Sequence, residues 1–355
     1  MTISAQSGLI AQNNFFDKQV ASQNLSNYLL LYKGDFAYNK SYSNGYPYGA
    51  VKRLEKFNCG VVSSLYIAFK PTHVLPNFLA EYYETTKWYV EIYKRAAEGA
   101  RNHGLLNISA TDFFNSDISL PKGEDEQEKI GQLFQSLDKT ITLHEEKQRQ
   151  LEQLKKALLQ KMFADETGYP VLRFKRFTEK WEQVELNDIA PVTMGQSPNS
   201  KNYTENPNNY ILVQGNADLF NGQVLPRIYT TQVTKVAHVG DILMSVRAPV
   251  GNIAQTQYDV VIGRGVAAIS GNLFIKQLLN KMDKAGYWNK YVAGSTFESV
   301  NSNDIKSANI KVPKLEEQKK IGQLFQSLDK TITLHDKKIQ YLKQLKRGLL
   351  QKMFV

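Results

Sequence analysis

Two stretches of the chain are nearly the same: QEKIGQLFQSLDKTITLHEEKQRQLEQLKKALLQKMF at residues 127–163 and QKKIGQLFQSLDKTITLHDKKIQYLKQLKRGLLQKMF at residues 318–354. They lie 191 residues apart and agree at 28 of 37 positions, and Lys129–His144 is repeated without a change. Chance does not produce such a match, so the chain contains an internal repeat. Since 355 residues suffice for two domains of about 150 residues each, the repeat predicts two units built on one plan.

Both stretches carry the pattern of a long helix. Apolar residues recur at alternating spacings of four and three, which is the 3.5-residue period of a coiled coil. Acidic residues at 124–126 and 316–317 suit the positive end of a helix dipole. We therefore predict helices at 124–163 and 313–355 that pair along an apolar seam. The predicted seam consists of Ile130, Phe134, Leu137, Ile141, Leu151, Leu158, Ile321, Phe325, Leu328, Ile332, Leu342 and Leu349.

The charges of the two helices favour antiparallel pairing with each other inside one chain. Residues 127–163 hold five acids and seven bases, whereas residues 318–354 hold two acids and nine bases. The second helix therefore repels a copy of itself more than it repels the first helix. Because exposed ion pairs contribute only about 0.2–1 kcal/mol each, the apolar seam holds the pair and charge selects the partner.

The regions ahead of the two helices, 1–123 and 171–312, read as mixed α/β domains, and residues 164–170 read as a linker. In the second domain we predict strands at 210–213, 241–246 and 260–262 and a helix over 273–292. In the first domain, Gly34–Lys40 matches Gly240–Arg247 in residue type, and a helical stretch over 77–97 follows. Only 33 residues precede the first Gly-Asp turn, against 69 from Val171 to Val239, so we expect a first domain that is short on its N-terminal side.

Together these patterns predict an α+β fold. Two α/β domains alternate with two long helices that form an antiparallel coiled coil, and the two halves are related by a pseudo-two-fold repeat.

Composition excludes several classes of protein. No apolar run reaches the roughly 18 residues of a membrane span, and the N-terminus lacks the pattern of a secretory signal, so we expect a cytoplasmic protein. Cys59 is the only cysteine and the five histidines form no metal-ligand pattern, so we predict no metal site. There is no GxxxxGK[ST] phosphate loop and no Asn/Asp-Pro-Pro-aromatic methyltransferase signature, so we assign no catalytic residue. The formal charge of +10 favours a polyanionic partner.

Four features together resemble the DNA-specificity subunits of type I restriction–modification systems. They are the helix lead-in Pro313–Gln318 with its near copy Pro121–Gln127, the sequence GDILMSVRAPVGNI at 240–253, the GQSP turn at 195–198, and the alternation of divergent domain with repeated helix. The resemblance covers nearly the whole chain.

This resemblance implies a non-catalytic subunit that reads a split DNA target. Each variable domain would be a target-recognition domain for one half of a double-stranded sequence, and the paired helices would set the distance between them. Two modification subunits that methylate adenine would bind the helices, and restriction subunits would join. The resemblance places S-adenosylmethionine, ATP and Mg²⁺ on those partner subunits and no cofactor on this chain.

Contacts with phosphates and base edges need Lys, Arg, Asn, Gln and small polar donors on a fixed frame. Each domain has two groups of such donors, and aromatic residues lie among the donors in both domains. In the first domain the candidates are Lys40, Tyr42, Asn44, Tyr46, Arg101 and Asn102. In the second domain they are Gln196, Ser197, Lys201, Asn202, Tyr203, Arg247 and Arg264. Arg264 has an alternative role in supporting the turn Gly263-Arg264-Gly265.

Two other interpretations stay open. The chain is a coiled-coil adaptor that binds only proteins, or it is a partial or silent copy of a specificity gene. Two different α/β domains argue against a simple adaptor, which has no use for them.

Overall fold

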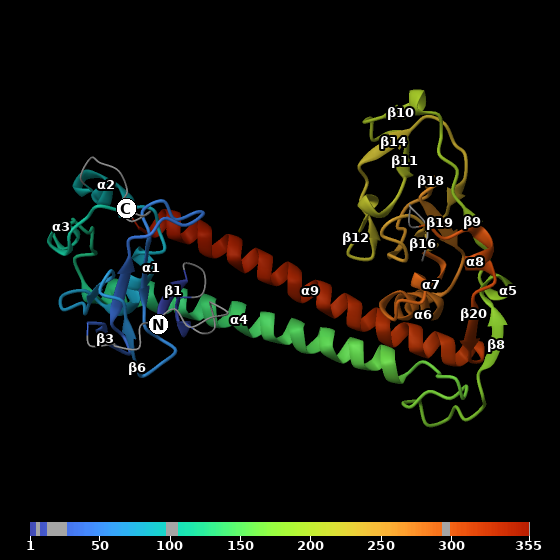
Figure 1. The fold of residues 1–355 in the computed structure, drawn as a ribbon, viewed down its shortest axis with the longest axis horizontal. Helices are drawn as coiled ribbons and strands as arrows, with labels where there is room; N and C mark the ends of the chain where they lie inside the picture. Colours follow the sequence, from blue (N-terminus) through green and yellow to red (C-terminus); the bar gives the residue numbers. More distant parts are fainter. Residues whose placement is uncertain (5–7, 13–26, 97–105, 293–298, 355) are drawn as a thin grey trace. The chain divides into compact units, whose positions relative to one another are not determined.

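A computed structural model describes residues 1–4, 8–12, 27–96, 106–292 and 299–354 (Figure 1). The chain forms two compact units. The first unit contains Met1–Glu146 and Asp336–Val355, and the second contains Lys147–His335. The boundary crosses both long helices, so each unit contains one part of each helix.

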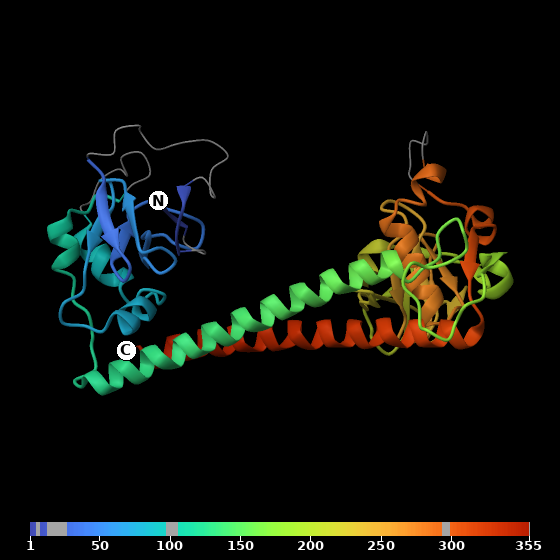
Figure 2. The same ribbon diagram turned by 90° about the horizontal axis from the view of Figure 1, so that it is seen from below.

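The two long helices are α4, Glu124–Lys161, and α9, Leu315–Met353. In the first unit the N-terminal part of α4 packs against the C-terminal part of α9, and the rings of Phe134 and Phe354 lie 6.0 Å apart. In the second unit the opposite ends meet, and Phe163 lies 5.9 Å from Phe325. Within each unit the helices therefore run antiparallel (Figures 1 and 2).

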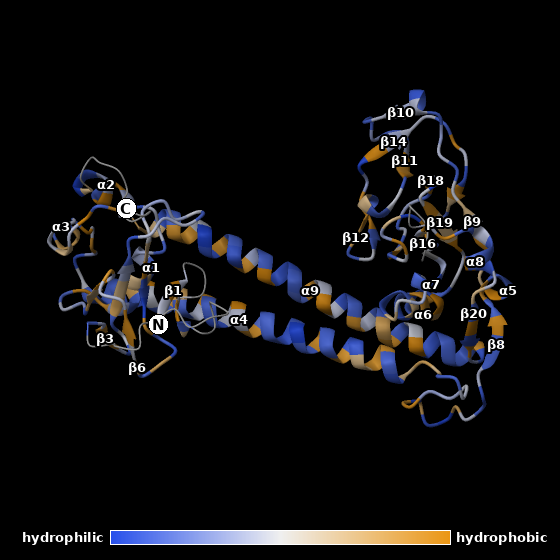
Figure 3. Cartoon of the chain, in the orientation of Figure 1, coloured by the Kyte–Doolittle hydropathy of each residue, from blue (hydrophilic) through white to orange (hydrophobic). Residues whose placement is uncertain are grey.

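The apolar seam lies where the heptad pattern predicts it. Hydrophobic residues recur along both helices between hydrophilic ones (Figure 3). All twelve seam side chains are buried or half-buried, and Phe134 and Phe325 are fully buried. Ile141, Ile339 and Leu342 form a separate apolar cluster in the first unit. Burial of these side chains removes apolar surface from water, at about 25 cal/mol per Å², and stabilises the pair.

An ion pair between the long helices occurs in each unit, and the two pairs use equivalent residues. The Lys346 ammonium of α9 lies 2.7 Å from the Asp138 carboxylate of α4. The Lys155 ammonium of α4 lies 2.5 Å from the Asp329 carboxylate of α9. Both residues of the second pair are the 191-residue counterparts of the first, so the pseudo-two-fold repeat extends to single contacts.

The second unit contains two larger sheets and a strand pair. The six-stranded sheet has the order β12-β13-β17-β16-β19-β9, the five-stranded sheet has the order β10-β14-β11-β18-β15, and β8 pairs with β20. The strands are β8 Glu182–Glu185, β9 Val192–Met194, β10 Tyr203–Thr204, β11 Tyr210–Val213, β12 Leu219–Phe220, β13 Gln223–Val224, β14 Ile228–Thr230, β15 Val236–Ala237, β16 Ile242–Ser245, β17 Ile253–Gln255, β18 Val260–Ile262, β19 Val266–Ile269 and β20 Asn309–Val312. The short helices are α5 Leu186–Ile189, α6 Leu273–Lys284, α7 Asn289–Val292 and α8 Ser302–Lys306.

The first unit contains smaller sheets. β4 lies between β5 and β7, β3 pairs with β6, and β1 pairs with β2, all antiparallel. The strands are β1 Thr2–Ser4, β2 Gly8–Ile10, β3 Leu29–Tyr32, β4 Phe36–Asn39, β5 Ala50–Arg53, β6 Cys59–Val62 and β7 Ile67–Phe69. The helices are α1 Pro76–Tyr82, α2 Tyr89–Arg95 and α3 Ala110–Phe114.

The Gly-Asp turn matched in the sequence has the same geometry in both units. Gly34 and Gly240 adopt positive φ values of 101° and 94°, which glycine tolerates without strain. The Asp35 carboxylate accepts the backbone N–H of Tyr32 at 2.7 Å, and Asp241 accepts that of His238 at 2.9 Å. β4 and β16 follow these turns, and each becomes the centre of an antiparallel group of three strands.

A glycine in each long helix brings it close to the first helix that follows the sheet. A Cβ atom on Gly131 would lie 2.7 Å from the Asn77 Cβ, and one on Gly322 would lie 2.8 Å from the Leu273 Cβ. Gly131 and Gly322 belong to the identical part of the repeat, so the same joint is built twice.

The predicted α+β fold with two antiparallel long helices is confirmed. The predicted strands coincide with β11, β16 and β18. The helical stretches predicted at 77–97 and 273–292 are each broken into two helices, because Gly286 turns the chain at φ 68° after α6 and Thr85 caps a turn after α1. The domain boundaries proposed from the sequence stay predictions, since the compact units divide both long helices.

Candidate nucleic-acid interface

The loop that follows β9 in the second unit is fixed to its neighbours by backbone bonds. Gln196 donates its N–H to the Ile262 carbonyl at 2.9 Å, and its own carbonyl accepts the Thr234 hydroxyl at 2.5 Å. The Gln196 side chain is exposed. A polar side chain on a fixed backbone is what base-edge recognition requires.

Ser197 and Arg264, which are 67 residues apart, meet at this loop. The Ser197 hydroxyl accepts the backbone N–H of Arg264 at 3.1 Å. A Cβ on Gly265 would lie 2.2 Å from the Gln214 carbonyl oxygen, so the flanking glycine permits close approach of the strand ends. The backbone of Arg264 thus supports the turn, while its side chain is exposed and has no ion pair within the described residues. Both interpretations of Arg264 from the sequence, DNA contact and support of the turn, are therefore compatible with the structure.

Arg247 lies next to this turn. It follows β16, and the N–H of the preceding Val246 donates to the Gly265 carbonyl at 2.9 Å. Its side chain is exposed, and across the part of the chain that is described it forms no ion pair. The ends of β9, β16 and β18 thus bring Gln196, Ser197, Arg247 and Arg264 to one region, which we call the second-unit cluster.

The side chains of two glutamines contact the rest of the loop. The Gln232 side-chain oxygen accepts the Asn202 amide at 2.7 Å and the Asn199 backbone N–H at 2.8 Å. The Tyr203 hydroxyl lies 3.5 Å from the Gln214 side-chain oxygen. Asn202 and Tyr203 are half-buried and position the loop, whereas Lys201 is exposed and forms no ion pair within the described residues.

Sequence reasoning missed Gln214 and Gln232. Gln214 follows β11 directly, as Gln196 follows β9 after one glycine, so a search for Gln beside Gly at strand ends would have found it. Gln232 has no such signal, because its contacts reach 33 residues back along the chain.

The first-unit candidates lie in the turn after β4. The Lys40 ammonium donates to the Ile108 carbonyl at 3.2 Å, so this cation supports the fold. Tyr42 and Asn44 are exposed beside a turn in which Tyr46 N–H donates to the Ser43 carbonyl at 2.8 Å. The Lys52 ammonium lies 5.9 Å from the centre of the Tyr46 ring. The structure therefore brings three of the four candidates to a surface turn and uses the fourth internally.

Arg101 and Asn102 lie outside the described residues. The chain after this segment matches the second unit: Leu106 N–H donates to the Lys40 carbonyl at 3.1 Å, and Val300 N–H donates to the Val246 carbonyl at 3.0 Å.

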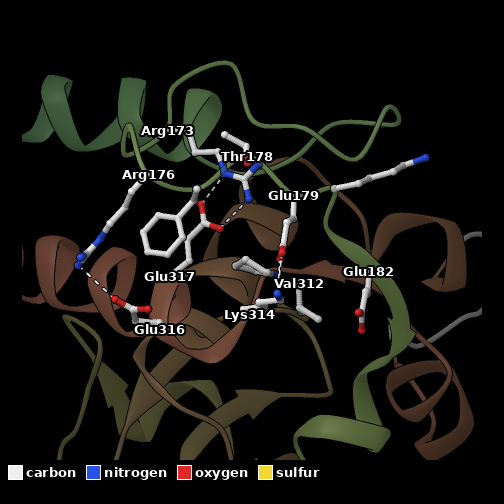
Figure 4. A pocket seen from close by; sticks show the side chains of 12 residues that line it. Arg173, Arg176, Thr178, Glu179, Glu182, Val312, Lys314, Glu316 and Glu317 are labelled. Atoms are coloured by element: carbon white, nitrogen blue, oxygen red, sulfur yellow. Dashed lines mark hydrogen bonds and ion pairs between the residues drawn. The ribbon is translucent and has the colours of Figure 1, made fainter.

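A second polar region lies in the second unit where the chain after α4 crosses the start of α9 (Figure 4). Arg173 donates to both carboxylate oxygens of Glu317, from Nε and from one terminal nitrogen, at 2.8 Å each. Glu317 is only 1% exposed. The charges compensate each other here, so the region is an internal clamp between two segments.

Neither a metal centre nor a membrane span emerges from the described ranges. Among those residues, His, Cys, Asp and Glu side chains nowhere gather in threes that fit a metal ion. Of the helices described, none combines the length and apolar character that crossing a membrane requires.

Comparisons with solved structures show the fold. The chain is similar to the HsdS subunit from Thermoanaerobacter tengcongensis, with a TM-score of 0.51 and 23% identity over 94% of this chain and 83% of that one. It is also similar to the type I restriction–modification S subunit from M. genitalium, with a TM-score of 0.60 and 16% identity over 91% and 83%. A chain from a study of complex assembly and conformational transition of the type I R-M system gives a TM-score of 0.55 and 23% identity over 93% and 84%.

Comparisons of sequence show the family. The chain is 28% identical over 275 residues to the putative type I restriction enzyme MjaX specificity subunit of Methanocaldococcus jannaschii, covering 73% of this chain. The match spans 63% of that relative's length. A model of the type I restriction modification DNA specificity domain matches residues 34–153 and 178–344, one match for each repeat. The chain therefore belongs to the family of type I restriction–modification DNA specificity domains.

Proposed function

We propose that this chain is a non-catalytic specificity subunit that binds a bipartite duplex DNA target, one half-site for each unit. The observation that carries the proposal is the contrast between a constant frame and divergent loops. The Gly-Asp turn, the central strands and the helix joint are built twice, whereas the loops that follow the equivalent strands β4 and β16 differ in sequence. A repeated frame with different exposed donors suits the reading of two different half-sites.

The second-unit cluster supports the proposal in chemical terms. Arg247 and Arg264 supply two exposed guanidinium groups on neighbouring strand ends, and an arginine pairs bidentately with guanine in the major groove. Gln196 suits the N6 and N7 atoms of adenine in the same groove. Lys201, exposed in the loop that follows β9, has a charge suited to phosphate.

We further propose that the paired helices α4 and α9 hold two adenine methyltransferase subunits and that restriction subunits join them. In this scheme S-adenosylmethionine, ATP and Mg²⁺ bind the partners, and the complex works in the cytoplasm. Exposed leucines at matching positions of both helices, Leu143 with 64% and Leu334 with 57% exposure, are available for such contacts.

The test is a selection of bound duplexes from a randomised library, with the adenine methyltransferase partner present. The expected result is a consensus of two short blocks separated by a gap of unspecified bases. Failure to bind duplex DNA with the partner present would instead support the protein-only adaptor.

An Arg247→Gln variant sharpens the selection. If Arg247 reads a base, the variant relaxes one position in one block, and discrimination there falls by about 1–3 kcal/mol. Arg149→Gln is the matched control, since it removes the same charge from an exposed position of α4 whose repeat counterpart is Gln340. Equal weakening across all sequences would assign Arg247 to phosphate contact.

A further inference from the structure

In the second unit, the segment that follows α4 docks on the start of the long helix α9, and we call this contact the clamp. Arg173 forms two parallel hydrogen bonds to Glu317, the strongest arrangement of this pair. Arg173 is also largely buried, with 13% of its side chain exposed. Figure 4 shows Arg173, on the chain that follows α4, with its two hydrogen bonds to Glu317 of α9.

Three further contacts complete the clamp. Arg176 lies 3.1 Å from the Glu316 carboxylate, and the Lys320 ammonium lies 5.4 Å from the centre of the Phe177 ring. Lys314 and Glu179 form an ion pair at 2.6 Å. On the helix side, the clamp therefore uses four side chains, Lys314, Glu316, Glu317 and Lys320.

The start of α4 carries the same four kinds of side chain. Lys122 follows Pro121 as Lys314 follows Pro313, and at the 191-residue offset Asp125, Glu126 and Lys129 correspond to Glu316, Glu317 and Lys320. All four are exposed, and within the described residues none has an ion pair or a side-chain hydrogen bond. Glu317 is buried under Arg173, whereas the equivalent Glu126 is exposed.

The helix beneath these four side chains is held in the same way in both units. The Gln127 side-chain oxygen accepts the Leu75 N–H at 3.1 Å, and the equivalent oxygen of Gln318 accepts the Asn272 amide at 2.8 Å. Gly131 and Gly322 then make the same close joint one turn later. The four side chains of the first unit therefore project from an equivalent frame.

Among the described residues of the first unit, an exposed apolar surface accompanies the charges. A hollow in the first unit is lined by Glu126, Lys129, Ile130, Leu133, Lys352 and Met353. Leu133 is 39% exposed, whereas its counterpart Leu324 packs against the core of the second unit. The first unit thus has both the charged and the apolar parts of a clamp, and no segment among the described residues occupies them.

We infer that Lys122, Asp125, Glu126 and Lys129 form a docking site for an Arg-Phe-Lys-Arg-Phe type segment of a second polypeptide chain. The occupied clamp defines the chemistry of the occupant: an arginine for Glu126, a second arginine for Asp125, and an aromatic ring beside Lys129. The alternation of acids and lysines disfavours both a nucleic acid and a metal ion. The site is separate from the second-unit cluster and does not depend on DNA binding.

The probe is a labelled synthetic peptide with the sequence Leu172–Lys180, added to the intact chain and followed by fluorescence anisotropy. The expected result is saturable binding at the first unit. Glu126→Gln should weaken it about ten-fold or more, because it removes one half of a charge-assisted bidentate pair. A peptide carrying Arg173→Lys should weaken similarly, because lysine lacks the planar fork.

Glu128→Gln is the matched control. It removes the same charge two residues further on, at a position whose counterpart is Lys319 and which is not among the four clamp side chains. Peptide affinity should be unchanged in this variant at constant ionic strength. Absence of saturable binding would overturn the inference, and so would equal weakening by Glu126→Gln and Glu128→Gln, which would indicate general charge attraction.

Discussion

At the scale of single residues, the clearest difference between the units is Glu81 against Gln277. Glu81 is buried, and its Oε2 atom lies 3.2 Å from the Lys346 ammonium but accepts no hydrogen bond within the described residues. Gln277 occupies the same place in the second unit and donates to Asp329 at 3.1 Å. Burial raises the pKa of Glu81 to about 7, assisted by Asp138 and Glu84 and opposed by Lys346.

This difference predicts a pH-dependent stability of the first unit. Because the folded protein holds the Glu81 proton more tightly than the unfolded chain does, the contribution of Glu81 is complete below about pH 4.5 and is lost as the pH rises through 7. Glu81→Gln should therefore become more stable relative to the parent over this range, by at most about 3 kcal/mol. Urea unfolding between pH 4.5 and 8 measures the difference.

Gln277→Glu provides the reciprocal variant. It places a carboxyl at the equivalent site and should add a loss of stability with rising pH. Parallel pH profiles for the parent and Glu81→Gln would show that Glu81 titrates normally.

The sequence revealed some of the site and not the rest at this scale. Arg247 and Arg264 stand out because they follow apolar strands. The internal role of Lys40 depends on a carbonyl 68 residues away, and the sheet register that brings Gln214 to Ser197 has no local signal. Contacts between distant parts of the chain decide which donors stay exposed. A local sequence pattern therefore identifies candidate DNA-contacting residues but does not distinguish exposed donors from donors that support the fold.

At the scale of elements, the three glycines of the long helices have different environments. A Cβ on Gly131 would meet Asn77 and the backbone N of Phe78 at 2.7 and 3.2 Å. Gly322 is equally enclosed, with Leu273 Cβ at 2.8 Å and Phe274 N at 3.0 Å. A Cβ on Gly348 would meet nothing within 4 Å, and its repeat counterpart is Ala157.

We therefore predict opposite effects of one substitution. Gly131→Ala and Gly322→Ala should each destabilise the chain by about 1–3 kcal/mol, because backbone atoms must move to admit the methyl group. Gly348→Ala should stabilise it by about 0.5–1 kcal/mol, since alanine is the better helix former in open space. Thermal unfolding followed by circular dichroism compares the three, and a stabilising Gly131→Ala would refute the close joint.

Prediction from sequence succeeded best for the helices. Their seam depends on a local 3.5-residue period, and the repeat shows the period twice. The sheets depend on distant pairings, such as the parallel alignment of β11 with β18 and the pairing of β9 with β19, which are not encoded in any short window.

At the scale of the whole molecule, the net charge of +10 favours binding to a polyanion such as DNA. If DNA binding releases counterions, the logarithm of the binding constant should fall linearly with the logarithm of salt concentration. Lys201→Gln should reduce the magnitude of that slope by about 0.9, because one phosphate contact is lost. Filter binding at several salt concentrations gives the slope for a target and for an unrelated duplex.

The two kinds of contact should separate in this measurement. Lys201→Gln should weaken binding to both duplexes alike, whereas Arg247→Gln should act mainly on the target. An unchanged salt slope for Lys201→Gln would remove this lysine from the phosphate contacts.

The joint at Gly131 and Gly322 has a consequence for inheritance. A side chain on the glycine would meet the Cβ and backbone carbon of Asn77 or Leu273 and the backbone nitrogen of Phe78 or Phe274, atoms that both units supply at similar distances. It lies inside the sixteen residues that are identical in both copies, Lys129–His144 and 320–335. A crossover between two such genes anywhere in that segment would leave these sixteen residues unchanged and exchange everything that follows them. New pairs of recognition surfaces can therefore arise in one step with the joint unchanged.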